Sequence, residues 1–115
     1  MRFRNLTDID QIDEIEKLSR TSIRGVLIFK HSTRCAISSM ALNRFTRGWD
    51  LGEEQLPVYY LDLIRYRSVS DQVSERFGVV HQSPQVLLIK NGTCIYHASH
   101  NAISPSRIVE EAEYA

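Results

Sequence analysis

The sequence predicts an α/β domain in which helices cover both faces of a central mixed sheet. Apolar runs with strand character alternate with segments whose apolar residues recur at helical spacing, which is typical of parallel strands joined by right-handed crossovers. The last two apolar runs are separated by Asn91-Gly92, the strongest short signal for an antiparallel hairpin. The predicted order is α-β-α-β-α-β-β-α.

The whole chain, residues 1–115, is predicted to be one domain, because no linker or repeat interrupts it and this length buries a single core. Fourteen basic and fourteen acidic residues give a formal charge of zero, which argues against a nucleic-acid partner. The charged first residues lack the apolar region of a secretory signal, and no apolar run reaches the roughly 20 residues of a membrane span. We therefore expect a cytoplasmic protein with no membrane partner.

The first half of the chain predicts two helices and a buried strand. Apolar residues recur at helical spacing from Ile9 to Leu18, and Thr7 with Asp10 resembles a capping box before them. The stretch 25–31 contains four consecutive apolar residues, as in a strand that is covered on both faces. Helical spacing then returns over residues 37–45.

The second half predicts a strand, a helix, a hairpin and a last helix. The apolar and aromatic run 57–63 indicates a strand, and residues 69–77 carry apolar residues at steps of four. The runs 84–90 and 93–99 form the predicted hairpin. The Ser-Pro pair at 104–105 is typical of a helix start, with proline at the first helical position.

Cys35 carries the clearest predicted chemistry. It lies between the strand at 25–31 and the following helix, where unpaired N–H groups and the helix dipole stabilise an anion. The thiolate is the form of cysteine that attacks disulfides, and Arg34 can add positive potential. The alternative is that Cys35 is an ordinary small residue at a helix start. We favour a reactive thiol.

The residue three positions after Cys35 is Ser38, so the chain contains Cys-Ala-Ile-Ser, a CxxS motif, rather than Cys-x-x-Cys. A hydroxyl one turn into the helix can donate a hydrogen bond to the thiolate, but it cannot form or leave a disulfide. Exchange would then finish with an outside thiol. The alternative is that Ser38 is only a polar residue of the first turn.

Cys94 is not predicted to resolve Cys35. A two-residue hairpin pairs Ile89 with Cys94 near the turn, whereas Pro84 at the other end of that strand faces the reactive end. The five residue steps from Pro84 to Ile89 span on the order of 15 Å, and a disulfide requires Cα atoms within about 7 Å. We interpret Cys94 as a core or edge cysteine. We expect both cysteines to rest as thiols and no metal site to form.

Two histidines are possible auxiliary residues. His31 and His81 would lie in loops at the reactive end, where an imidazole can move a proton or donate a hydrogen bond. No third group is visible that would hold either ring as a general base. Binding, solvation and packing therefore stay open as alternatives.

The element order, the cysteine at the start of the helix after the first strand, and the proline at the head of the hairpin strand resemble the thioredoxin or glutaredoxin fold. Proteins with this fold carry a cis-proline at that place, facing the nucleophile. The resemblance implies that the bond between Ser83 and Pro84 is cis and that Ser83 offers its backbone to a bound thiol or peptide.

The segments KHSTRCAISSMAL and HQSPQVLLIKNG are similar to the YtxJ family, thioredoxin-like proteins described as bacillithiol-system redox-active proteins or monothiol bacilliredoxins. The resemblance implies that the protein removes bacillithiol, or a similar low-molecular-weight thiol, from protein mixed disulfides. A second bacillithiol molecule would regenerate the enzyme. Bacillithiol would be a co-substrate, no cofactor would stay bound, and the partners would be proteins that carry such mixed disulfides.

The same resemblance implies roles for individual residues. Cys35 would be the nucleophile, Ser38 the residue at the lost resolving position, and Ser83 with Pro84 the substrate-facing loop. We take Cys35 and Ser38 as the catalytic residues, and we expect Arg34 and Ala36, which flank Cys35, to bind the substrate together with that loop. The family usually has proline directly after the cysteine, where this chain has Ala36. An alanine keeps the N–H that a proline lacks, so this amide can hydrogen-bond the sulfur.

Two other functions are compatible with the sequence. Cys35 could ligate an iron–sulfur cluster between two subunits, as in some monothiol glutaredoxins, which visible absorbance would reveal. The chain could instead be a non-catalytic thioredoxin-like adaptor, and normal exchange rates in Cys35→Ser would support that alternative. We favour the exchange enzyme.

Overall fold

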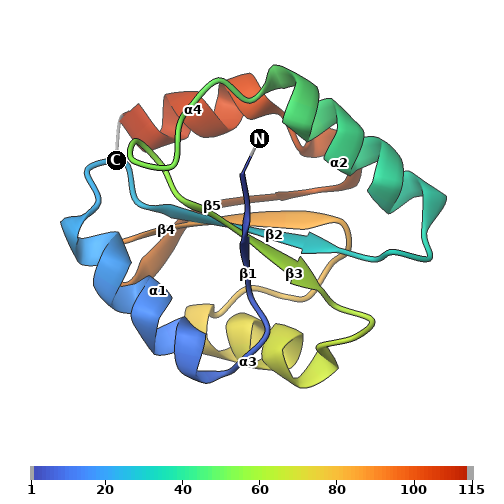
Figure 1. The fold of residues 1–115 in the computed structure, drawn as a ribbon, viewed down its shortest axis with the longest axis horizontal. Helices are drawn as coiled ribbons and strands as arrows, with labels where there is room; N and C mark the ends of the chain where they lie inside the picture. The colour runs from blue at the N-terminus through green and yellow to red at the C-terminus, as the bar shows by residue number, and fades with distance from the viewer. Residues whose placement is uncertain (1, 114–115) are drawn as a thin grey trace.

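The computed structural model describes residues 2–113 and places five strands in one mixed sheet (Figure 1). Their order in the sheet is β1-β3-β2-β4-β5. β3 pairs in parallel with both β1 and β2, whereas β4 is antiparallel to both β2 and β5. The strands are β1 (Arg4–Asn5), β2 (Val26–His31), β3 (Val58–Asp62), β4 (Gln85–Lys90) and β5 (Thr93–Ser99). The predicted mixed sheet is confirmed.

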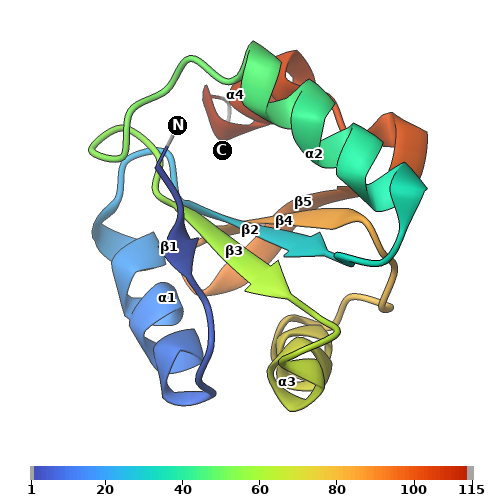
Figure 2. The same ribbon diagram turned by 45° about the vertical axis from the view of Figure 1, so that its right-hand side comes forward.

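The helices lie in two layers on either side of the sheet. Figures 1 and 2 show α1 and α3 on one face and α2 and α4 on the other. The helices are α1 (Asp10–Thr21), α2 (Ala36–Gly48), α3 (Arg67–Phe77) and α4 (Pro105–Glu113), with a 3₁₀ turn η1 (His100–Ala102) before α4. The sequence did not predict β1 or η1, because elements of two or three residues show no periodicity. No helix among the described residues is long and apolar enough to cross a membrane.

All six residues of β2 are buried, as predicted for a strand covered on both faces. Side chains of a strand point alternately to its two faces. Leu27 and Phe29 therefore pack with Phe45 of α2 in one core, while Val26 and Ile28 pack with α1 and α3 in the other. Each of these side chains contributes about 1.5–3 kcal/mol by burial. The end of β2 is thus fixed from both sides at the point where the chain turns toward α2.

The predicted hairpin is confirmed in both its turn and its register. Asn91 and Gly92 have φ angles of 52° and 80°, and Ile89 pairs with Cys94. Both central residues of a type I′ turn require positive φ, which asparagine and glycine tolerate.

The capping box predicted between Thr7 and Asp10 is wrong. Instead, Gln11 Oε1 accepts hydrogen bonds from the amides of Thr7 at 2.8 Å and Asp8 at 3.0 Å. A glutamine side chain is long enough to reach back a full turn, so Gln11 satisfies the Thr7 amide that Asp10 was expected to satisfy, and the Asp10 amide itself donates to Asp8 Oδ1 at 3.0 Å.

Gly25, which precedes β2, tests how closely the sheet packs around this strand. Its φ is +90°, and a Cβ there would collide with the Ile89 carbonyl oxygen, whereas Gly78 has φ +64° and open space around a Cβ. We expect Gly78→Ala to lower the free energy of unfolding by about 1–2 kcal/mol from backbone strain alone. Gly25→Ala should cost more than about 2 kcal/mol. Urea unfolding measures both, and equal losses would contradict the packing described here.

Candidate active site

Cys35 is the N-cap residue of α2 and is partly exposed. Its backbone is extended, its N–H donates to the Ser32 carbonyl at 3.2 Å, and its carbonyl accepts from the Ser39 N–H at 3.0 Å. The first amides of an α-helix have no intrahelical acceptor, so the sulfur belongs to a residue that adjoins several unpaired donors. This position confirms the predicted helix start.

The residues on either side of Cys35 are exposed. Ala36 is the first residue of α2 and keeps its N–H, and Arg34 belongs to the turn that leads out of β2. Both residues are therefore accessible to a substrate that approaches the sulfur. Their roles in binding stay predictions.

Ser38 is fully buried and ties the turn after β2 to the first turn of α2. Its hydroxyl oxygen accepts a hydrogen bond from the Ser32 N–H at 3.0 Å and shares a hydrogen bond with His31 Nδ1 at 2.8 Å. No hydrogen bond joins Ser38 to Cys35 among residues 2–113. The geometry therefore gives Ser38 a structural role in the turn, and its predicted contact with the thiolate stays a prediction.

The sequence predicted a loop position for His31, but this prediction is wrong, because His31 is the last residue of β2. Only 4% of its surface is exposed. Its ring lies 5.7 Å from the ring of Tyr60 and is hydrogen-bonded to Ser38. Burial lowers the pKa of His31, although the nearby Asp62 and the hydrogen bond with Ser38 act in the opposite direction. A neutral imidazole is thus favoured beneath the turn that carries the cysteine.

The peptide bond between Ser83 and Pro84 is cis, as the resemblance implied. The Pro84 carbonyl accepts a hydrogen bond from the His100 N–H at 3.0 Å, which joins this loop to η1. Within residues 2–113, the backbone of Ser83 forms no hydrogen bond and its buried Oγ has no partner. These groups leave Ser83 able to pair with an incoming chain, the role predicted for it.

Lys30 is a buried amine that sequence analysis did not single out. Its Nζ donates to Ser74 Oγ at 2.7 Å and to the Ser70 carbonyl at 3.4 Å, and it lies 3.3 Å from His81 Nδ1. Burial lowers the pKa of Lys30 to about 8, although the negative charge of Asp71 acts to raise it. The only signal in the sequence was one lysine that directly follows an apolar run.

His81 lies in the loop that precedes the cis-proline, as predicted, and Lys30 connects this loop to β2 and α3. Burial lowers the pKa of His81, the positive charges of Lys30 and Arg67 lower it further, and Asp71 opposes them. The protonated Lys30 amine can donate to Nδ1 of the neutral ring. His81 therefore holds the loop in place through this hydrogen bond.

Cys94 lies on the edge strand β5 and is half-buried against the core beneath α1 and α3. Its thiol donates to the Tyr96 carbonyl, with 3.3 Å between sulfur and oxygen. Burial raises the pKa of the Cys94 thiol. The prediction of a core or edge cysteine is confirmed.

Among residues 2–113, no group of three or more histidine, cysteine or acidic side chains is placed to hold a metal ion.

The structural role of Ser38 can be tested against its neighbour. We expect Ser38→Ala to lower the free energy of unfolding by about 1–3 kcal/mol, because the Ser32 amide and His31 lose a buried partner. The matched control is Ser39→Ala, on the same turn of α2, which should change stability by less than about 0.5 kcal/mol. Urea unfolding at neutral pH compares them, and similar values for both variants would contradict the role assigned to Ser38.

The buried Lys30 amine makes stability depend on pH. Its pKa is lowered from 10.5 to about 8 in the folded state, so the unfolded chain binds more protons between these values and stability rises with pH. We expect the unfolding free energy of the wild type, relative to Lys30→Met, to increase from about pH 7.5 to 9.5. Chemical denaturation at several pH values measures this difference. Parallel curves for the two proteins would contradict the assignment, and the exposed Lys17→Met serves as the control.

Comparisons with known proteins agree with this fold. A family model described as monothiol bacilliredoxin BrxC matches residues 4–108. A solved structure of a proposed oxidoreductase with a thioredoxin fold aligns with a TM-score of 0.76 and 30% identity, over 96% of this chain and 92% of that chain. Thioredoxins of Malassezia sympodialis and Fasciola hepatica align with TM-scores of 0.71 and 0.69 at 17% and 10% identity. The first alignment covers 98% of this chain and 90% of the Malassezia thioredoxin, and the second covers 97% of this chain and 98% of the Fasciola thioredoxin. The predicted thioredoxin-like fold is confirmed.

Proposed function

This chain belongs to the monothiol bacilliredoxin family, and we propose that it removes bacillithiol, or a similar low-molecular-weight thiol, from protein mixed disulfides through Cys35. Family and fold together support the broader assignment as a thiol oxidoreductase. The observation that carries the proposal is a partly exposed cysteine at the N-terminus of α2, beside a loop with a cis-proline.

The register of the sheet supports this juxtaposition. Lys30 near the end of β2 pairs with Gln85 at the start of β4. The turn that carries Cys35 and the loop that ends at Pro84 therefore lie at the same end of these two strands. A substrate could then pair with the unoccupied backbone of Ser83 while its disulfide meets the sulfur. Extended substrates commonly add to a chain through such main-chain hydrogen bonds.

The proposed reaction has two exchange steps. The Cys35 thiolate attacks the bacillithiol sulfur of the mixed disulfide, the protein substrate leaves as a thiolate, and Cys35 becomes capped. A second bacillithiol thiolate then attacks the bacillithiol sulfur of that cap. Oxidised bacillithiol leaves, and the Cys35 thiolate is regenerated. The enzyme ends the cycle in its original oxidation state. The substrate cysteine is reduced to a thiol, and the two bacillithiol molecules are oxidised to their disulfide.

Two side chains could compete with an outside thiol for the capped Cys35, and the positions of both support resolution from outside. Ser38 has no sulfur, and its hydroxyl is engaged with Ser32 and His31. Cys94 is paired with Ile89 near the hairpin turn, several residues along the strand from the end that leads to Pro84. The proposal also places the protein in the cytoplasm, where thiols are kept reduced by small thiols.

Incubation with oxidised bacillithiol tests the proposal directly. We expect intact mass to show one adduct on the wild type and on Cys94→Ser, and none on Cys35→Ser. Reduced bacillithiol should then release the adduct. Cys94→Ser is the matched control, because it removes the other thiol and leaves the turn after β2 unchanged. An adduct confined to Cys94, or no adduct on the wild type, would rule out the proposed mechanism.

A further inference from the structure

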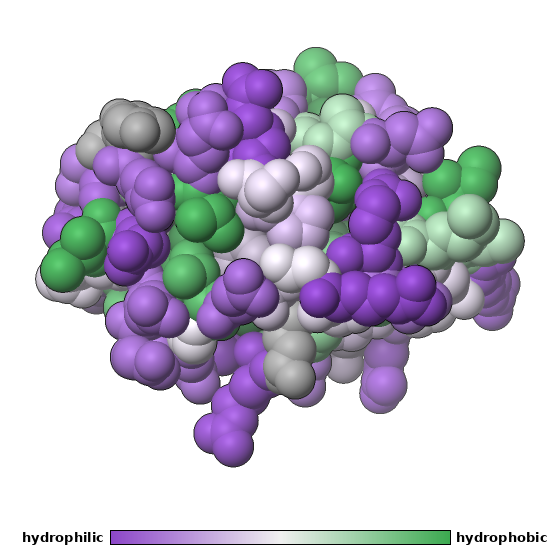
Figure 3. All heavy atoms as spheres, turned by 90° about the horizontal axis from the view of Figure 1, so that it is seen from above, coloured by the Kyte–Doolittle hydropathy of each residue, from purple (hydrophilic) through white to green (hydrophobic). Residues whose placement is uncertain are grey.

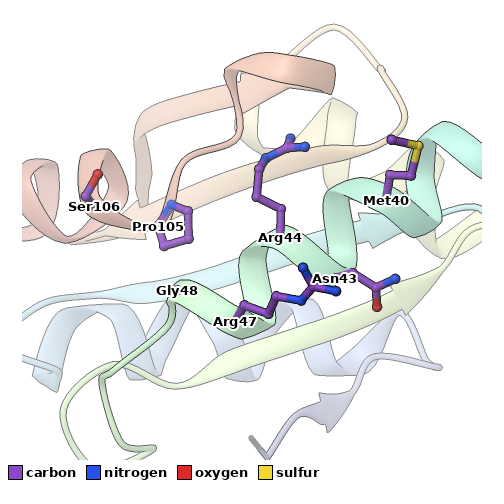
Figure 4. A pocket seen from close by; sticks show the side chains of 7 residues that line it. All are labelled: Met40, Asn43, Arg44, Arg47, Gly48, Pro105 and Ser106. Carbon is purple, nitrogen blue, oxygen red and sulfur yellow. The ribbon is translucent and has the colours of Figure 1, made fainter.

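A groove between α2 and α4 lies on the face of the molecule that carries Cys35. It has a volume of about 700 Å³. Figure 3, which views the molecule from the side of α2 and α4, shows hydrophobic and hydrophilic atoms interspersed on this face. Figure 4 shows side chains of α2 on one side of the groove and the start of α4 on the other. The residues that line the groove include Met40, Asn43, Arg44, Arg47, Pro105 and Ser106. We call it the α2–α4 groove.

The α2–α4 groove is continuous with the reactive end of the protein. Ile37 and Met40 are 57% and 66% exposed although both are apolar, and they lie on the helix stripe that continues to the groove. At about 1.5 Å per residue, Met40 is about 7.5 Å and Arg47 about 18 Å along the helix from Cys35. A substrate bound at the sulfur can therefore reach the groove without leaving this face.

A second connection runs through η1. The His100 N–H donates to the Pro84 carbonyl at 3.0 Å, and the His100 carbonyl accepts from Arg44 Nη2 at 3.1 Å. Arg44 Nε also donates to the Ile103 carbonyl at 3.3 Å. Arg44 is thus held in place as part of the wall, which joins the groove to the cis-proline loop.

The charge of the α2–α4 groove is positive. The helix α2 contains no acidic residue, and Arg44 and Arg47 both line the groove. Within residues 2–113, neither arginine forms a salt bridge, whereas Arg76 is paired with Asp13 and Glu16 on the other side of the sheet. The chain as a whole has a formal charge of zero, so this positive surface is local. Its complement is a segment with negative charge and some apolar character.

We propose that the α2–α4 groove binds an acidic segment of the protein that carries the mixed disulfide, and this rests on the function proposed above. Arg44 and Arg47 are both exposed, but among residues 2–113 only the Arg44 side chain is hydrogen-bonded, so Arg47 would meet the segment. Met40 and Ile37 would contact apolar side chains between that charge and the disulfide. An extended chain advances about 3.3 Å per residue, so the acidic residues would lie about six residues from the modified cysteine. Substrates would then be selected by charge as well as by their modified thiol.

Peptides with a central cysteine in mixed disulfide with bacillithiol test this proposal. Three versions carry aspartate, asparagine or lysine about five and six residues from the cysteine on both sides. The readout is the ratio of kcat/KM for the aspartate peptide to that for the lysine peptide, in which effects on the shared chemistry cancel. We expect a ratio of about three to five in the wild type at low salt, the size typical of exposed charge pairs. The ratio should fall toward one as salt is raised.

Charge reversals on opposite faces provide the decisive comparison. Arg47→Glu should bring the ratio to one or below, and Arg47→Lys should keep most of it. Lys17→Glu makes the same change in charge on α1, across the sheet, and should retain the wild-type ratio. An unchanged ratio in Arg47→Glu, or no charge preference in the wild type, would overturn the docking proposal alone.

Two further outcomes separate this proposal from its alternatives. If Arg47→Glu dissociates a wild-type dimer in sedimentation and leaves the peptide ratio unchanged, the groove binds a second copy of the chain and the proposal is wrong. If the wild type releases bacillithiol from none of the three peptides, the exchange function itself fails, and the docking proposal fails with it.

Discussion

The buried hydroxyl of Ser38 organises the turn that carries Cys35. It accepts the Ser32 N–H and is hydrogen-bonded to His31, so the end of β2 and the first turn of α2 are held by one side chain. Cys35 lies between these anchored positions. Sulfur is a weaker hydrogen-bond acceptor than oxygen. A serine oxygen at this position therefore suits the turn that carries Cys35 better than a cysteine sulfur would.

The central strand serves the site from both of its faces. On the side of α2, His31 supports the turn that carries the cysteine. On the side of α3, Lys30 connects the strand to His81 and hence to the loop before the cis-proline. Burial disfavours the charged form of either histidine, so both rings act in the structure as neutral hydrogen-bonding groups.

Sequence periodicity predicted the elements that are long and strongly patterned. The apolar run of β2 and the Asn91-Gly92 turn each have one good structural interpretation, and the helix after Cys35 follows from the same reasoning. The cis bond before Pro84 came from the family resemblance, since the local sequence alone favours trans. The strand β1 was missed, because two residues carry no pattern and its pairing with β3 is purely tertiary. The side-chain partners of Ser38 depend on tertiary distances that no periodicity encodes.

The proposed exchange requires that a thiol from outside the protein resolves Cys35, and the kinetics of that step distinguish outside from internal resolution. Protein capped with bacillithiol is separated from excess reagent and mixed with reduced bacillithiol at several concentrations, and intact mass follows the loss of the cap. We predict a release rate proportional to bacillithiol concentration, with the same slope in Cys94→Ser. A rate independent of bacillithiol concentration, or one that is lost in Cys94→Ser, would show resolution within the chain and contradict the account.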